Sequence, residues 1–102
     1  LAEAHVLGLE YLRRGGASVA MNCSYGHGFS VHEVLAAVER VIGTSLQAKV
    51  GPRRIGDPPV LVGDGSRVVR DWGWAPKFDN LDVMIEGALA WERSLREGEK
   101  TV

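Results

Sequence analysis

Residues 30–42 carry the clearest helix signal in the chain. Ser30 and Glu33 form the S-x-x-E pattern of a capping box, in which each side chain bonds the other residue's backbone N–H at a helix start. Gly43 fits the helix end, where glycine is common. The apolar residues between these signals share one face: Val31, Val34, Leu35, Val38, Val41 and Ile42. The segment therefore predicts an amphipathic helix.

Other periodic segments complete an α/β prediction. Residues 1–14 and 79–96 predict two further main helices, and Asp79 or Asn80 is expected to cap the second of them. A brief helix is also expected, capped by Asp64 and ending near Asp71. The last helix should bury one face: Leu81, Met84, Ile85, Ala88, Trp91 and Leu95. Residues 18–22, which are bounded by turn formers, and residues 46–50, in which apolar and polar side chains alternate, predict short strands, and residues 60–62 predict a short extended segment. The expected fold is thus α/β, with three main helices and short strands, and Trp72 and Trp91 in the core.

Composition narrows the class of protein. The chain has 102 residues, enough for one small domain, and its formal net charge of -1 argues against nucleic-acid binding, which usually needs a basic excess. Cys23 is the single cysteine, so no internal disulfide is possible and a reducing compartment fits. No apolar run approaches the roughly 20 residues of a membrane span. The histidines lack the spacing of a metal site, so no metal is expected.

The octapeptide Pro52-Arg53-Arg54-Ile55-Gly56-Asp57-Pro58-Pro59 is the strongest candidate for a ligand site. Its prolines stiffen the backbone, and an arginine presents a planar fork of donors that matches phosphate oxygens. A carboxylate three residues later suits vicinal hydroxyls such as those of a ribose. These two groups together indicate a nucleotide-sugar site. The alternative is a surface loop with an Arg–Asp ion pair, worth about 0–1 kcal/mol.

Five collinear blocks carry a resemblance to a known family. They are 1–5, Asn22 with 25–31, 52–58, 64–67 and 72–76. Over its whole length the chain resembles the C-terminal third of the UDP-glucose 4-epimerases, members of the extended short-chain dehydrogenase/reductase family. It departs from the family at Asn22-Cys23-Ser24, where Asn-Leu-Gly is usual, and at Trp72-Gly73-Trp74, where Leu-Gly-Trp is usual.

The resemblance implies four substrate-binding residues. Arg54 matches the arginine that binds the UDP diphosphate, and Asp57 matches the aspartate that holds the ribose hydroxyls. Val31 matches an apolar contact to the uridine. Leu61 falls at a position that faces the sugar and influences whether an N-acetyl group fits, so the substrate range stays open. Arg53 also matches a family residue, with no ligand role assigned.

The resemblance also implies what lies elsewhere. The family binds NAD through a glycine-rich N-terminal loop and transfers a proton with a Tyr-x-x-x-Lys pair. Neither tyrosine here supplies that pair, because Gly15 follows Tyr11 and Phe29 follows Tyr25 at the lysine position. We therefore expect residues 1–102 to form a single partial domain, the C-terminal substrate-binding region, without the NAD-binding region. No catalytic residue is expected in it, and alone it should be inactive.

The expected function is part of an NAD-dependent isomerase that interconverts UDP-glucose and UDP-galactose in galactose metabolism. The resemblance further implies that the whole enzyme is a cytoplasmic homodimer. Its expected partner is a UDP-sugar, and no binding to nucleic acid or to a membrane is expected. Three alternatives stay open: an epimerase of UDP-N-acetylhexosamines or UDP-uronates, a non-catalytic module that binds nucleotide-sugars or another chain, and a non-functional remnant.

Overall fold

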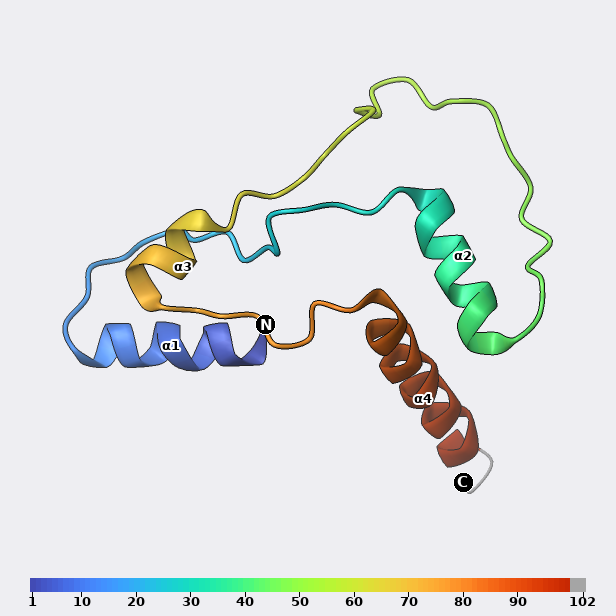
Figure 1. The fold of residues 1–102 in the computed structure, drawn as a ribbon. Helices are drawn as coiled ribbons and strands as arrows, with labels where there is room; N and C mark the ends of the chain where they lie inside the picture. The colour runs from blue at the N-terminus through green and yellow to red at the C-terminus, as the bar shows by residue number, and fades with distance from the viewer. Residues whose placement is uncertain (100–102) are drawn as a thin grey trace. The chain divides into compact units, whose positions relative to one another are not determined.

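Four helices make up the regular structure of the residues that the structure describes. The computed structural model describes residues 1–99, without the side chain of Glu99. Spatial contacts divide the chain into two compact units: unit 1 holds Leu1–Gly28 and Arg54–Lys77, and unit 2 holds Phe29–Arg53 and the chain from Phe78 onward. Figure 1 shows the long non-helical stretch between the second and third helices, which contains the candidate loop.

Unit 1 is built from α1 (Ala2–Arg13) and α3 (Ser66–Trp72), which pack together. Its buried side chains are Ala4, Val68 and Trp74, with Leu7, Met21 and Trp72 packed against them. Burial of a side chain such as that of Val68 stabilises the fold by about 1.5–3 kcal/mol. Gly73 ends α3 in a left-handed conformation at a φ of 66°, which turns the chain so that Trp74 enters the core.

Unit 2 pairs α2 (Val31–Ile42) with α4 (Leu81–Glu99). The predicted capping box is present: the Ser30 N–H donates to Glu33 Oε2 at 2.6 Å, and the Glu33 N–H donates to Ser30 Oγ at 3.1 Å. Buried Ala37 allows the helices to approach closely. Arg40 reaches across to Asp82, with Nη2–Oδ1 at 2.6 Å and Nε–Oδ2 at 3.3 Å.

The predicted strands are absent from residues 1–99, and four helices rather than three main ones form the fold. The fourth is short α3, which matches the brief helix expected after Asp64. The segments 18–22, 46–50 and 60–62 have strand-like composition, but a strand exists only when a second segment completes its hydrogen-bond ladder. Within the described residues no such partner segment is present for any of the three.

The predicted inner face of α4 is correct only in its first turns. Leu81, Met84 and Ile85 are buried or half-buried, whereas Ala88, Trp91 and Leu95 are exposed, Trp91 by 64%. The reason is length: α2 has 12 residues and α4 has 19, or about 18 Å against 28 Å, so the end of α4 extends past its partner. The tryptophans that enter the core are therefore Trp72 and Trp74, and the placement of Trp91 there was wrong.

None of the helices in residues 1–99 combines the length and apolar composition needed to cross a membrane.

Candidate functional site

The candidate ligand loop contains a tight turn at Arg54–Asp57. The Asp57 N–H donates to the Arg54 carbonyl oxygen at an N···O distance of 3.5 Å. Gly56, the third residue of the turn, has a φ of 90°, which a type II turn requires at that position and which glycine adopts readily. Ile55 at the tip is fully exposed. The turn thus brings the side chains of its first and fourth residues, Arg54 and Asp57, close together.

Those two side chains form an ion pair. Arg54 Nε donates to Asp57 Oδ2 at 2.9 Å, and the side chains are 84% and 48% exposed respectively. Water screens a pair of this kind, so it contributes about 0–1 kcal/mol to stability. The structure therefore juxtaposes the two residues predicted to hold a diphosphate and a ribose, and it also contains the ion pair of the alternative interpretation. The two interpretations are compatible, because the exposed pair leaves both side chains within reach of a ligand.

The other two predicted site residues lie outside this turn. Leu61 follows Asp57 by four residues in the extended segment and is 86% exposed. Val31 is the first residue of α2 and is 75% exposed, so its side chain is accessible to a ligand. Val31 belongs to unit 2, whereas the other three residues belong to unit 1. Within one unit, only Arg54 and Asp57 are brought into contact.

Ser24 anchors the chain that follows the turn. Its hydroxyl donates to the Gly63 carbonyl oxygen and accepts from the Gly26 N–H at 3.1 Å. A Cβ on Gly65 would overlap the Ser24 backbone, and one on Gly63 would lie 3.0 Å from Ser24 Cβ. The two glycines therefore permit a close crossing of segments 24–26 and 63–65, which fixes the far end of the candidate loop in unit 1.

A hollow of about 320 Å³ lies beside this crossing, lined by 24–26, 64–66, Val69 and Arg70. The Ser66 N–H donates to Asp64 Oδ1 at 2.9 Å, and this bond lowers the pKa of the Asp64 carboxyl. Arg70 Nε bonds Asp71 Oδ1 at 2.8 Å, which lowers the pKa of Asp71. The acids and bases of this hollow thus bond neighbouring residues of α3 and its start, and they support the helix.

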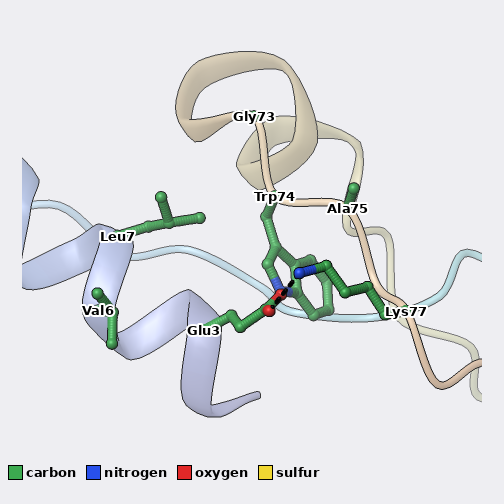
Figure 2. Close-up of a pocket in the computed structure, with 7 residues that line it drawn as sticks. All are labelled: Glu3, Val6, Leu7, Gly73, Trp74, Ala75 and Lys77. Atoms are coloured by element: carbon green, nitrogen blue, oxygen red, sulfur yellow. Dashed lines mark hydrogen bonds and ion pairs between the residues drawn. The ribbon is translucent and has the colours of Figure 1, made fainter.

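Two larger hollows flank α1 and do not include the candidate turn. Figure 2 shows the first, about 340 Å³, where Val6 and Leu7 of α1 face the segment that carries Trp74. Lys77 Nζ and Glu3 Oε1 form an ion pair at 2.7 Å across its edge. The second hollow, about 400 Å³, lies on another side of α1 and includes Trp72. Both are mostly apolar, and neither is lined by an arginine.

Aromatic rings also gather in unit 1. Tyr25 stacks on His27 at a centroid distance of 6.2 Å and on Trp74 at 6.3 Å. Tyr11 packs against Trp72 at 5.4 Å, and its hydroxyl donates to the Ala17 carbonyl oxygen at 3.0 Å. Both tyrosines therefore have packing roles. Among residues 1–99, no three His, Cys, Asp or Glu side chains are grouped so as to hold a metal ion.

Comparison with known proteins relates the chain to one family of enzymes. No protein-family model matches it. It is 52% identical over 97 residues to a UDP-glucose 4-epimerase of Azospirillum brasilense, covering 95% of this chain and 28% of that protein. It is 42% identical over 98 residues to the UDP-glucose 4-epimerase of Lacticaseibacillus casei, covering 96% of this chain and 30% of that protein.

Solved structures agree. A crystal structure of UDP-glucose 4-epimerase superimposes on this chain with a TM-score of 0.84 at 40% sequence identity. The match covers 90% of this chain and 28% of the chain in that crystal structure. The enzyme from Stenotrophomonas maltophila, solved with bound NAD and formylated UDP-arabinopyranose, matches 95% of this chain and 29% of its own with a TM-score of 0.83 at 35% identity. The chain is thus homologous to a region of UDP-glucose 4-epimerase that makes up less than a third of that enzyme, which confirms the resemblance predicted from the sequence.

Proposed function

We propose that the chain is the UDP-sugar-binding part of a UDP-glucose 4-epimerase that interconverts UDP-glucose and UDP-galactose. The observation that carries the proposal is the Arg54–Asp57 turn, which presents a guanidinium and a carboxylate together on an exposed loop of a chain 52% identical to such an enzyme. We place the chain in the C-terminal region of that enzyme, as a single partial domain. The whole enzyme would be a cytoplasmic homodimer of galactose metabolism.

The roles proposed for the site residues are those that the family resemblance implies, and the chemistry of each side chain suits its role. The guanidinium of Arg54 carries a permanent charge and donors that match diphosphate oxygens. The Asp57 carboxylate accepts hydrogen bonds from vicinal ribose hydroxyls. Val31 offers an accessible apolar contact to the uracil. Leu61 cannot donate a hydrogen bond to the sugar, so it acts on substrate choice through its size, and N-acetylated or uronate sugars remain alternatives to the hexoses.

We infer that the residues of this chain do not hold NAD, since Val31 stands where the third glycine of a G-x-G-x-x-G loop would follow Gly26 and Gly28. The only tyrosines, Tyr11 and Tyr25, lack a lysine four residues later, and both have packing roles in unit 1. We therefore place NAD and the proton-transferring pair on the remainder of the enzyme, and we route no chemical step through these 102 residues. When bound, NAD supplies the hydride chemistry. The chain alone would bind substrate without converting it.

Titration of the 102-residue chain with UDP tests this proposal. Binding heats measured by isothermal titration calorimetry should show one site, and Arg54→Ala should weaken it by about 1.5–3 kcal/mol, the range for hydrogen bonds to charged groups. The matched control is Arg13→Ala, which removes an exposed arginine of the same unit far from the turn in sequence. Arg13→Ala should bind UDP as the unaltered chain does.

Two results would contradict the proposal. The first is the absence of UDP binding by a chain whose circular dichroism shows the expected helices. The second is equal UDP affinity of the Arg54→Ala and Arg13→Ala variants, since that would remove Arg54 from the site.

A further inference from the structure

We propose that Asp57 is a positioning residue for Arg54: it holds the guanidinium through Nε so that the two terminal nitrogens face the diphosphate. This inference rests on the proposed function, because it concerns the same UDP site. It assigns Asp57 a second task beside the ribose contact, and that task can be measured with a ligand that has no ribose.

The atom that makes the bond is the first reason. The 2.9 Å contact to Asp57 Oδ2 uses Arg54 Nε. A guanidinium has five N–H donors on three nitrogens, so one bonded at Nε keeps the edge formed by Nη1 and Nη2 for a second acceptor. That edge matches two oxygens of a phosphate. The Arg54 side chain is 84% exposed, so a ligand in solution can reach it.

The backbone is the second reason. Arg54 and Asp57 are the first and fourth residues of a turn closed by the Asp57 N–H bond to the Arg54 carbonyl and permitted by the φ of 90° at Gly56. Pro52, Pro58 and Pro59 restrict the chain on both sides of the turn. The ion pair is thus held by a short, stiff backbone element, so it restrains the arginine without a large additional loss of freedom.

The restraint matters for affinity because a free arginine is flexible. An arginine side chain loses much rotamer freedom when it binds a ligand, and a group that is already held loses less. The carboxylate has the opposite effect through its charge, since it repels a phosphate nearby. If positioning dominates, removal of the Asp57 side chain should weaken phosphate binding, whereas if repulsion dominates, the same change should strengthen it.

A carboxylate can also serve both tasks at once. It has two oxygens with about four acceptor positions, so bonding Arg54 through Oδ2 does not exhaust its capacity for ribose hydroxyls. A ligand with both groups reports the sum of the two effects. Inorganic pyrophosphate contains the phosphates without the ribose, and it isolates the effect that acts through Arg54.

The experiment compares pyrophosphate binding by the unaltered chain, Asp57→Asn and Asp57→Ala, measured by NMR titration. Asparagine keeps an acceptor oxygen for Nε and removes the charge, whereas alanine removes both. We expect Asp57→Ala to bind pyrophosphate about 3- to 10-fold more weakly than the unaltered chain, and Asp57→Asn to bind at least as tightly. Asp71→Asn is the control, because Asp71 also bonds an arginine Nε but lies in α3. It should leave the affinity unchanged.

A second readout follows the bond itself. The Arg54 Nε–H resonance should exchange with water more slowly than that of Arg13, and Asp57→Ala should remove the difference while Asp57→Asn retains part of it. A role in overall stability would not produce this pattern, since the helical circular dichroism of all variants should agree.

The outcomes separate this inference from the proposed function. If Asp57→Ala binds pyrophosphate as tightly as the unaltered chain, or more tightly, positioning is overturned while UDP binding through Arg54 still stands. If the unaltered chain binds pyrophosphate but Asp57→Asn is weakened as much as Asp57→Ala, an acceptor oxygen beside Nε does not hold the guanidinium for the ligand, and the inference is again overturned. If the unaltered chain binds neither pyrophosphate nor UDP, both proposals fall.

Discussion

Gly56→Ala tests whether the shape of the turn, rather than its composition, makes the site. An added Cβ at Gly56 has no atom within 4 Å, so the substitution creates no collision. Its cost arises from the φ of 90°, a conformation that disfavours side chains by about 1–2 kcal/mol. The turn should therefore relax and separate Arg54 from Asp57, and a ligand would have to restore it. The affinity for UDP should fall by up to about 5- to 30-fold.

Gly51→Ala is the matched control for this change. Gly51 lies on the same loop and also has open space around its Cβ position, but its φ is not positive. Both variants should be titrated with UDP by calorimetry, with circular dichroism to confirm that the helices persist. Equal affinities for Gly51→Ala and Gly56→Ala would show that UDP binding does not depend on this turn.

Two further predictions concern the scaffold. Gly65→Ala forces a Cβ into the Ser24 backbone and should lower the free energy of unfolding by about 1–3 kcal/mol. Gly87→Ala, in α4 with open space around the new Cβ, should raise the free energy of unfolding by about 0.5–1 kcal/mol. Urea unfolding measures both changes, and a Gly65→Ala variant as stable as the unaltered chain would contradict the close crossing. The bond from the Ser30 N–H lowers the pKa of the Glu33 carboxyl from its ordinary 4.5. The capping box therefore stabilises the fold above that pH, and this stabilisation is lost as the pH falls through the folded-state pKa of Glu33. Helicity followed from pH 7 downward should show this loss, and Glu33→Gln should reduce it; an identical pH profile in Glu33→Gln would exclude Glu33 as its source.

Local signals in the sequence predicted the start and end of α2 and the start of α4, whereas α3 begins after Gly65 rather than at a cap formed by Asp64. Ser30, Glu33 and Gly43 act within a few residues, and the structure has each of them in the predicted role. Asn80 caps α4 as expected, through a bond from the Val83 N–H to its side chain at 3.1 Å. Such caps depend on residues three or four positions apart, so a single sequence contains the information needed.

Features that depend on distant partners were not predictable in the same way. The segments 18–22, 46–50 and 60–62 have the composition of strands, but a ladder needs a second segment that composition does not specify. The end of α4 has a continuous apolar stripe, yet Trp91 is exposed because α2 is shorter. Local periodicity reports which face is apolar and cannot report how far the partner helix extends.

In the candidate site, too, the contact between residues near in sequence was predictable and the contact between distant residues was not. Arg54 and Asp57 are three residues apart, so their contact in a turn follows from the spacing and from Gly56 between them. Ser24 was missed as an anchor, because its acceptor on Gly63 lies 39 residues away. One signal was available: Ser24 stands where the family usually has glycine, and a hydroxyl at such a position calls for a partner.

A crystal structure of the chain with UDP would show whether Arg54 and Asp57 form the ligand site. The diphosphate should lie on the terminal nitrogens of Arg54, within hydrogen-bond distance, and the Asp57 carboxylate should contact the ribose hydroxyls. UDP bound elsewhere in the chain, without contact to Arg54 or Asp57, would contradict this assignment.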